Sequence, residues 1–171
     1  MSVENEGYLT IEELKAAGQY PSGARFQEGP VAVIECVQEI PCNPCETACR
    51  FGAIRVGEPI TNLPKADEGK CTGCGLCVAR CPGLAIFIVD KTYGEGLGAV
   101  SFPYEYFPLP SEGDEVTAVD RAGRGVCAGT VVKILAPESF DRTPVVTVAV
   151  PVGKAEDVRG IERAGQAGGQ S

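Results

Sequence analysis

The stretch Cys71-Thr-Gly-Cys74-Gly-Leu-Cys77-Val-Ala-Arg-Cys81-Pro82 places four cysteines within eleven residues and ends them with a proline. A loop this short can turn the thiols of its first three cysteines toward one inorganic group, whereas the fourth, beyond a helical turn, points elsewhere. Gly73 and Gly75 let the backbone approach such a group closely and bend around it. The stretch therefore predicts a metal-binding loop, and its fourth cysteine implies a second site in the chain.

An imperfect copy of this stretch lies 32 residues upstream, counted from Cys74 back to Cys42. In both copies a C-x2-C pair is followed by C after three more residues, and an Ala-Ile pair stands four residues beyond that last cysteine. Each half is therefore expected to form a cysteine loop, a short helix and a returning strand, over residues 53–56 in the first half and 85–89 in the second.

Cysteine thiolates are soft ligands that bind both iron in sulfide clusters and zinc. Zinc sites with four cysteines usually combine two separated C-x2-C pairs, whereas here three cysteines follow one another at +3 and a fourth follows at +4 before proline. This spacing favours an iron–sulfur cluster, and a zinc-binding interaction module is the alternative. The chain has no histidine, which excludes Rieske clusters, histidine-ligated haem and histidine-containing zinc sites.

With this motif, the chain from Val31 to Val89 resembles the two-cluster bacterial ferredoxins. The resemblance implies a pseudo-symmetric α+β domain that holds two [4Fe-4S] clusters, with the fourth cysteine of each half reaching across to the other half. One cluster, here cluster A, would be bound by Cys49, Cys71, Cys74 and Cys77. The other, cluster B, would be bound by Cys42, Cys45 and Cys81 together with a fourth ligand.

The fourth ligand of cluster B is the point at which this chain departs from the family. Glu39 stands three residues before Cys42, where the first cysteine of the copy is expected. Cys36 could close the site through a longer loop, Glu39 could bind through oxygen, or the site could hold a [3Fe-4S] cluster. We favour Cys36, because thiolate is the ligand that such clusters prefer. Arg50 also stands where the family often has proline, and a cation there would raise a cluster potential.

The rest of the chain divides around this repeat. The predicted fold is α+β, a two-cluster domain followed by a small antiparallel β module. The expected parts are an N-terminal arm with a short helix capped by Thr10 (1–30), the two-cluster domain (31–92), a linker and aromatic-proline strap (93–112), a β-sheet or barrel of three strands (113–161) and a disordered tail (162–171). The strap either packs across the domain or docks a partner. Cys127, in the β module, is expected to be a small buried hydrophobe.

Composition limits the partners. The formal net charge is -8 and the pI is about 4.6, which disfavours nucleic acid and anionic lipid. No stretch approaches the roughly 20 apolar residues that cross a bilayer, and the first ten residues are polar and acidic, unlike a secretory segment. Nine cysteines at these spacings suit a reducing compartment, so we expect a cytoplasmic protein.

Two clusters in one small domain predict electron transfer. The chain shows no nucleophile with a base and no phosphate loop, so we expect no enzyme activity of its own. The additions around the repeat, with the segment 35–45 and the end of the β module, are similar to the small iron–sulfur subunits of multi-subunit flavin dehydrogenases of the proline or hydroxyproline type. That similarity implies FAD-containing partner subunits. The alternatives are a free ferredoxin-type electron carrier and a structural cysteine-rich metal-binding module.

Overall fold

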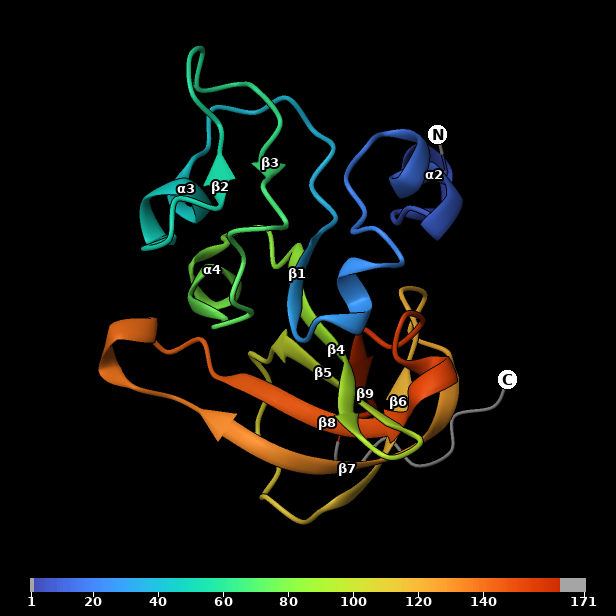
Figure 1. The fold of residues 1–171 in the computed structure, drawn as a ribbon. Coiled ribbons are helices and arrows are strands. Elements are labelled where there is room, and N and C mark those ends of the chain that lie inside the picture. Colours follow the sequence, from blue (N-terminus) through green and yellow to red (C-terminus); the bar gives the residue numbers. More distant parts are fainter. Residues whose placement is uncertain (1, 164–171) are drawn as a thin grey trace.

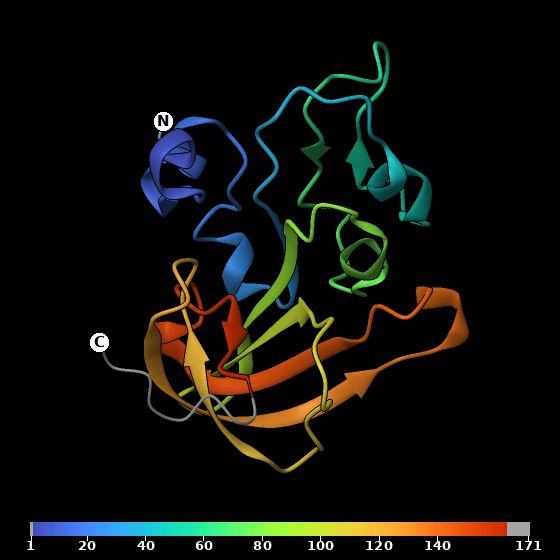
Figure 2. The same cartoon turned by 180° about the vertical axis from the view of Figure 1, so that it is seen from behind.

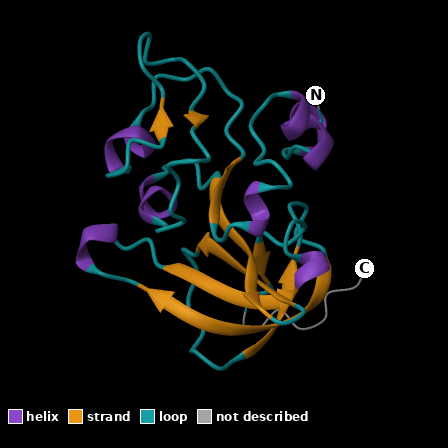
Figure 3. Ribbon diagram, in the orientation of Figure 1, coloured by secondary structure: helices purple, strands orange, loops and turns teal. Residues whose placement is uncertain are grey.

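One seven-stranded antiparallel sheet runs through most of the chain. The structure, a computed structural model, describes residues 2–163, and the strand order in the sheet is β1-β4-β5-β8-β7-β6-β9. The strands are β1 (Val31–Ile34), β4 (Ile86–Gly94), β5 (Leu97–Pro103), β6 (Glu115–Val119), β7 (Gly125–Leu135), β8 (Val145–Pro151) and β9 (Gly160–Ile161). The strands that flank the cysteine repeat thus share a sheet with the predicted β module, as Figures 1 and 3 show.

The stretch from Tyr93 to Gly98, expected to be a linker, instead contains the turn of the β4–β5 hairpin. Gly96 lies in this turn with φ +69°, a backbone conformation that suits glycine. A Cβ on Gly98 would lie 2.8 Å from the Cβ of Ala155, so this second glycine allows close packing. Gly96 therefore serves a tight turn, and Gly98 allows two segments to pack closely. Glycine is common in such turns as well as in linkers, so composition alone does not distinguish the two.

The three strands predicted for the β module are confirmed as β6, β7 and β8. Their valine-rich sequences suit a pleated, half-buried surface, and β8 is buried at five of its seven positions. It lies between β5 and β7, pairing with β5 along its whole length from Val145 opposite Pro103 to Pro151 opposite Leu97. With the pairing of β5 to β4 and of β4 to β1, it joins the C-terminal third of the chain to the strands that flank the cysteine repeat.

The cysteine repeat forms a separate layer on one side of the sheet, visible from both directions in Figures 1 and 2. It consists of α3 (Pro44–Ala48), β2 (Ile54–Arg55), β3 (Lys65–Ala66) and α4 (Leu76–Arg80), with β2 and β3 paired. α3 begins with a proline, whose missing N–H costs nothing at that position. α4 begins after Gly75, which has φ +80°.

β1 and β4 separate two hydrophobic cores because successive side chains of a strand point to opposite faces. Phe87 and Val89 of β4 belong to the core formed with the rest of the sheet. Ile86 and Ile88 belong to the core formed with the cysteine layer, which also contains Val78 of α4. The cysteine layer therefore packs on one face of β1 and β4.

The N-terminal arm contains α1 (Val3–Glu6), α2 (Ile11–Ala16) and the 3-10 turn η1 (Arg25–Gln27). The predicted cap is confirmed, because Thr10 and Glu13 form a reciprocal capping box at the start of α2. Two further 3-10 turns, η2 (Glu138–Phe140) and η3 (Val152–Lys154), flank β8. The tail expected to be disordered lies, from residue 164 on, outside the described residues, and within them no helix is long and apolar enough to span a membrane.

Candidate metal centres

Four cysteines of the repeat line one cavity beside α4. They are Cys49, Cys71, Cys74 and Cys77, the set that the resemblance implies for cluster A. The space among the lining atoms is about 390 Å³, including the part open to solvent at its mouth. Phe51, Ile54 and Ile88 supply apolar walls, and Cys74 is the exposed cysteine of the four.

A second cavity is lined by the other four cysteines of the repeat: Cys36, Cys42, Cys45 and Cys81. The space among its lining atoms is about 380 Å³, again including the part open to solvent. Ile34, Ile40 and Ile86 line it as well. Glu39, the alternative fourth ligand, is exposed and is not among the described residues that line this cavity. Of the two candidate fourth ligands, the thiol of Cys36 therefore lines the second cavity and the carboxylate of Glu39 does not.

The cysteines that end the two short helices are exchanged between the cavities. Cys49 ends α3 but lines the cavity of the second half, and Cys81 ends α4 but lines the cavity of the first half. Both have extended backbone after a short helix, with ψ of 96° for Cys49 and 111° for Cys81. The crossover follows from the packing of α3 beside α4 (Figure 1).

Backbone N–H groups point at three of the sulfurs. The amide of Ala53 donates to Cys49 Sγ at 3.2 Å, and the amide of Ala85 donates to Cys81 Sγ at 3.4 Å. These two bonds occupy equivalent places in the repeat. The amide of Ala32 on β1 donates to Cys71 Sγ at 3.3 Å. N–H bonds to sulfur stabilise the anionic form and tune the potential of iron–sulfur clusters.

Burial first, and then the neighbouring thiols of the same set, raise the pKa of the most enclosed cysteines. The pKa of Cys77 is raised to about 12, with contributions from Cys71, Cys74 and Cys49. The pKa of Cys45 is raised to about 11, with contributions from Cys81, Cys36 and Cys42. These two thiols are therefore protonated at neutral pH without metal, and a bound metal must displace their protons.

Each cavity offers four cysteine thiols, the soft ligands that iron–sulfur clusters prefer. Soft donors, N–H groups aimed at sulfur and apolar walls fit an iron–sulfur cluster in each cavity. When bound, such a cluster supplies reversible one-electron transfer.

The ninth cysteine, Cys127, lies on β7, apart from both cavities. It is half-buried and packs against the core of the sheet, and burial raises its pKa. It therefore packs as the hydrophobic residue expected from the sequence, but it is half-buried and not fully buried.

Four charged residues near the two sites were not anticipated from the sequence: Arg25, Glu35, Arg121 and Arg159. Their hydrogen bonds join segments 43 to 124 residues apart. No local spacing could indicate such contacts.

Comparison with known proteins supports iron–sulfur chemistry for the second half of the repeat. Residues 64–87 match the family described as the 4Fe-4S binding domain. No solved structure matches the chain. The family match includes Cys71, Cys74, Cys77 and Cys81, and it supports at least one [4Fe-4S] cluster.

Three curated relatives match a short part of the chain. It is 51% identical over 47 residues to one subunit of the ion-translocating oxidoreductase complex of Methanosarcina acetivorans, covering 28% of this chain and 17% of the relative. It is 53% identical over 47 residues to one subunit of the Na(+)-translocating ferredoxin:NAD(+) oxidoreductase complex of Acetobacterium woodii, covering 28% and 14%. It is 46% identical over 48 residues to the polyferredoxin-like subunit of the aliphatic sulfonate oxidoreductase of Pyrococcus furiosus, covering 28% and 27%. The matched part is thus less than a third of each relative.

Proposed function

We propose that this iron–sulfur electron-transfer protein is a relay subunit that carries two [4Fe-4S] clusters within a larger oxidoreductase. The observation that carries the proposal is the pair of cavities, each lined by four cysteines and sharing the helix pair α3 and α4. The proposed ligands are Cys49, Cys71, Cys74 and Cys77 for cluster A, and Cys36, Cys42, Cys45 and Cys81 for cluster B. The chain itself performs no substrate chemistry in this proposal.

Electrons would enter at one cluster and leave at the other. Each cavity has one large apolar side chain that is both part of its wall and open to solvent: Phe51 at cluster A and Ile40 at cluster B, each 48% exposed. Exposed apolar side chains beside a redox centre suit contact with another protein. Two such openings, one for each site, support a relay with a donor on one side and an acceptor on the other.

The partner class is taken from the resemblance and from the names of the relatives. Those names describe subunits of oxidoreductase complexes, which supports a subunit role here. The resemblance to small iron–sulfur subunits of flavin dehydrogenases suggests FAD-containing subunits as the partner. The second candidate is a free electron carrier, which the ferredoxin-type motif itself favours.

The experiment is anaerobic purification of the tagged chain from its native host, with iron, sulfide and flavin analysis. We expect about eight iron atoms per chain, reduction of the clusters by dithionite as followed by electron paramagnetic resonance, and copurifying subunits that contain flavin. A chain that elutes alone at 17.9 kDa with both clusters would support the free carrier. Zinc in place of iron, or clusters that dithionite does not reduce, would overturn the relay.

A further inference from the structure

Two buried arginine contacts reach the cysteine layer from outside the repeat, one at each proposed cluster. The first starts from Arg25 in the N-terminal arm, which is 7% exposed. Its guanidinium donates to the carbonyl oxygens of Glu68 at 2.8 Å, Gly29 at 3.0 Å, Pro30 at 2.8 Å and Cys71 at 2.7 Å. The side chain of Arg25 thus links the N-terminal arm to the backbone of Cys71, a proposed ligand of cluster A.

The loop that Arg25 holds is tightly packed. Gly73, two residues after Cys71, has φ +67°, and a Cβ there would lie 2.4 Å from the Cβ of Pro30. The carbonyl of Pro30 is itself one of the acceptors of Arg25. Arg25 therefore holds both segments of this contact: Pro30, just before β1, and the loop that begins at Cys71.

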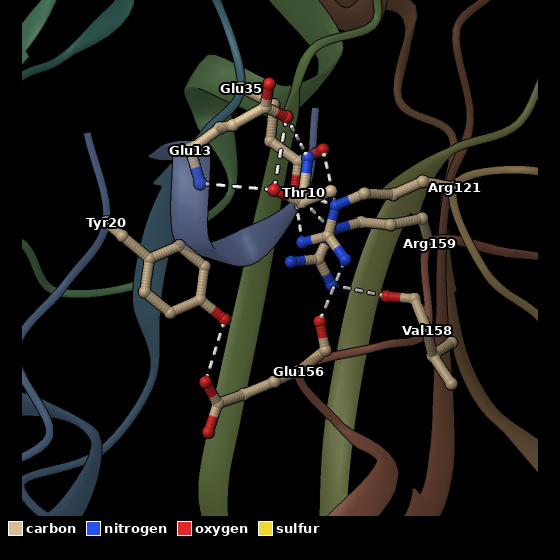
Figure 4. A network of polar contacts seen from close by, with 8 residues as sticks. All are labelled: Thr10, Glu13, Tyr20, Glu35, Arg121, Glu156, Val158 and Arg159. Atoms are coloured by element: carbon tan, nitrogen blue, oxygen red, sulfur yellow. Dashed lines mark hydrogen bonds and ion pairs between the residues drawn. The ribbon is translucent and has the colours of Figure 1, made fainter. Parts of the chain in front are cut away.

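The second contact centres on Glu35, the residue before Cys36 (Figure 4). Arg121, in the turn between β6 and β7, donates to both carboxylate oxygens, with distances of 3.0, 3.0 and 2.6 Å. Arg159, just before β9, donates to the same carboxylate at 2.7 Å. The side chains of Glu35, Arg121 and Arg159 are only 10%, 9% and 4% exposed, in that order.

The backbone of Glu35 connects this group to two cluster B ligands. Cys36 follows Glu35 directly, and the amide of Glu35 donates to the carbonyl of Ala85 at 2.8 Å. The amide of Ala85 in turn donates to Cys81 Sγ. A displacement of Glu35 would therefore move the segments of both Cys36 and Cys81.

The charges of the second contact do not balance. Two guanidiniums face one carboxylate, and Arg159 Nη2 is buried with no hydrogen-bond partner among the described residues. A buried cation is costly unless a compensating charge is near. Arg159 also stacks over the ring of Phe87 at 5.1 Å, and Phe87 belongs to the core of the sheet. The two arginines therefore hold Glu35 from the side of the sheet core, and Glu35 passes this constraint to Cys36 through the backbone.

We infer that Arg25 and the Glu35–Arg121–Arg159 group are positioning residues, each serving one cluster: Arg25 orients Cys71 for cluster A, and Glu35 orients Cys36 for cluster B. The inference rests on the two-cluster function proposed above. It gives the N-terminal arm and the C-terminal strands separate roles, because each extension controls one of the two redox centres.

The test compares Arg25→Met and Glu35→Gln in the full-length chain. Iron and sulfide content give the number of clusters, and the paramagnetically shifted Cβ protons of the cysteines, assigned with single Cys→Ser variants, show which cluster is affected. We expect Arg25→Met to lower iron from about eight toward four per chain with the Cys42 and Cys45 signals retained. We expect Glu35→Gln to do the reverse, losing cluster B or converting it to a three-iron cluster with the Cys74 and Cys77 signals retained.

The matched control is Glu156→Gln. Glu156 forms a more exposed ion pair with Lys91 at 2.6 Å, with side chains 27% and 23% exposed. Its backbone carbonyl accepts from Arg121, which the variant preserves, and its carboxylate bonds Lys91 and Tyr20. This variant should keep both clusters. Loss of both clusters together in either test variant, loss of the wrong cluster, or no change in both would overturn the inference.

Lysine variants separate charge from geometry and serve if the first variants fail to fold. Arg25→Lys keeps the positive charge but cannot reach four carbonyls, so cluster A should keep its midpoint potential while chelators remove it several-fold faster than cluster B. Arg121→Lys should do the same for cluster B. Equal decay of the two clusters in both lysine variants would contradict the inference. A wild-type chain with fewer than two clusters, or a Cys36→Ser variant with cluster B intact, would instead contradict the proposed function.

Discussion

Cys36 is the residue on which the proposed ligand set of cluster B depends. It lines the cavity with Cys42, Cys45 and Cys81, and burial raises its pKa, with further contributions from the thiols of Cys81 and Cys42. Cys36→Ser should convert cluster B to a three-iron form or lose it, because a hydroxyl is a poor ligand for cluster iron. The iron content should fall from about eight to between four and seven atoms per chain, with cluster A unchanged in its resonance signal.

Glu39→Gln is the matched control for Cys36. Because Glu39 is exposed, its amide variant should keep the wild-type iron content and midpoint potentials. Loss of iron in Glu39→Gln with no loss in Cys36→Ser would reverse the assignment of the fourth ligand.

Glu13 in the N-terminal arm titrates far below an ordinary glutamate. Hydrogen bonds from the side chain of Ser2 and from the amides of Thr10 and Ser2 lower its pKa from 4.5 to about 2. Since the folded pKa is depressed, the stabilisation of the arm is complete above about pH 4.5 and is lost as the pH falls toward 2. A carboxyl-carbon NMR titration should place the Glu13 midpoint near 2, and Ser2→Ala should move it upward. A midpoint that stays near 2 in Ser2→Ala would show that Ser2 is not the main cause.

At the level of elements, the loop between β3 and α4 depends on the missing side chain of Gly73. Gly73→Ala adds the cost of positive φ for a non-glycine residue, about 1–2 kcal/mol, and a clash with the Pro30 backbone at 2.7 Å. Gly96→Ala is the matched control, because Gly96 has φ +69° but nothing within 4 Å of an added Cβ. Thermal unfolding should show a small loss for Gly96→Ala and a larger one for Gly73→Ala, together with loss of cluster A only in the latter. Equal losses of stability would mean that the loop moves away from Pro30 without cost.

The sequence predicted the elements that depend on local pattern. The capping box at Thr10 and the three C-terminal strands follow from periodicity and turn chemistry. The β4–β5 hairpin was missed because the run of glycines around Gly96 has the composition of a linker. The four charged residues around Cys71 and Cys36 were missed because their contacts are formed only when distant segments meet, which no spacing rule describes.

The aromatic-proline segment was expected either to pack across the domain or to dock a partner, and its two ends differ in burial. Tyr104 is 4% exposed and packs in the core of the sheet, whereas Phe107 is 88% exposed. A buried anchor followed by an exposed aromatic tip is compatible with both interpretations, packing at one end and docking at the other. The docking role of the tip remains a prediction.

At the scale of the whole molecule, the two cores should differ in how much they depend on metal. The cysteine layer has helices of five residues and strands of two, and helices this short are not stable alone. The sheet has its own core of valines and aromatics. Removal of the clusters by chelation should therefore expose the amides of residues 36–84 to hydrogen exchange while β5, β7 and β8 keep their protection.

Hydrogen exchange followed by mass spectrometry measures this difference peptide by peptide. Strand β6 is the internal reference, because it belongs to the core of the sheet and contributes no ligand to either proposed cluster. Uniform loss of protection over the whole chain would show instead that the two cores unfold as one cooperative unit.

The long-range contact of Glu35 has a consequence for biosynthesis. Glu35 and Arg159 are separated by 124 residues, whereas Arg25 and Cys71 are separated by 46. A chain made from its N-terminus toward its C-terminus therefore presents the complete surroundings of cluster A while it is still being translated. The surroundings of cluster B are complete only after nearly the last strand has left the ribosome. The two clusters would then be inserted in a fixed order, A before B, and a truncated chain would be released with only the first.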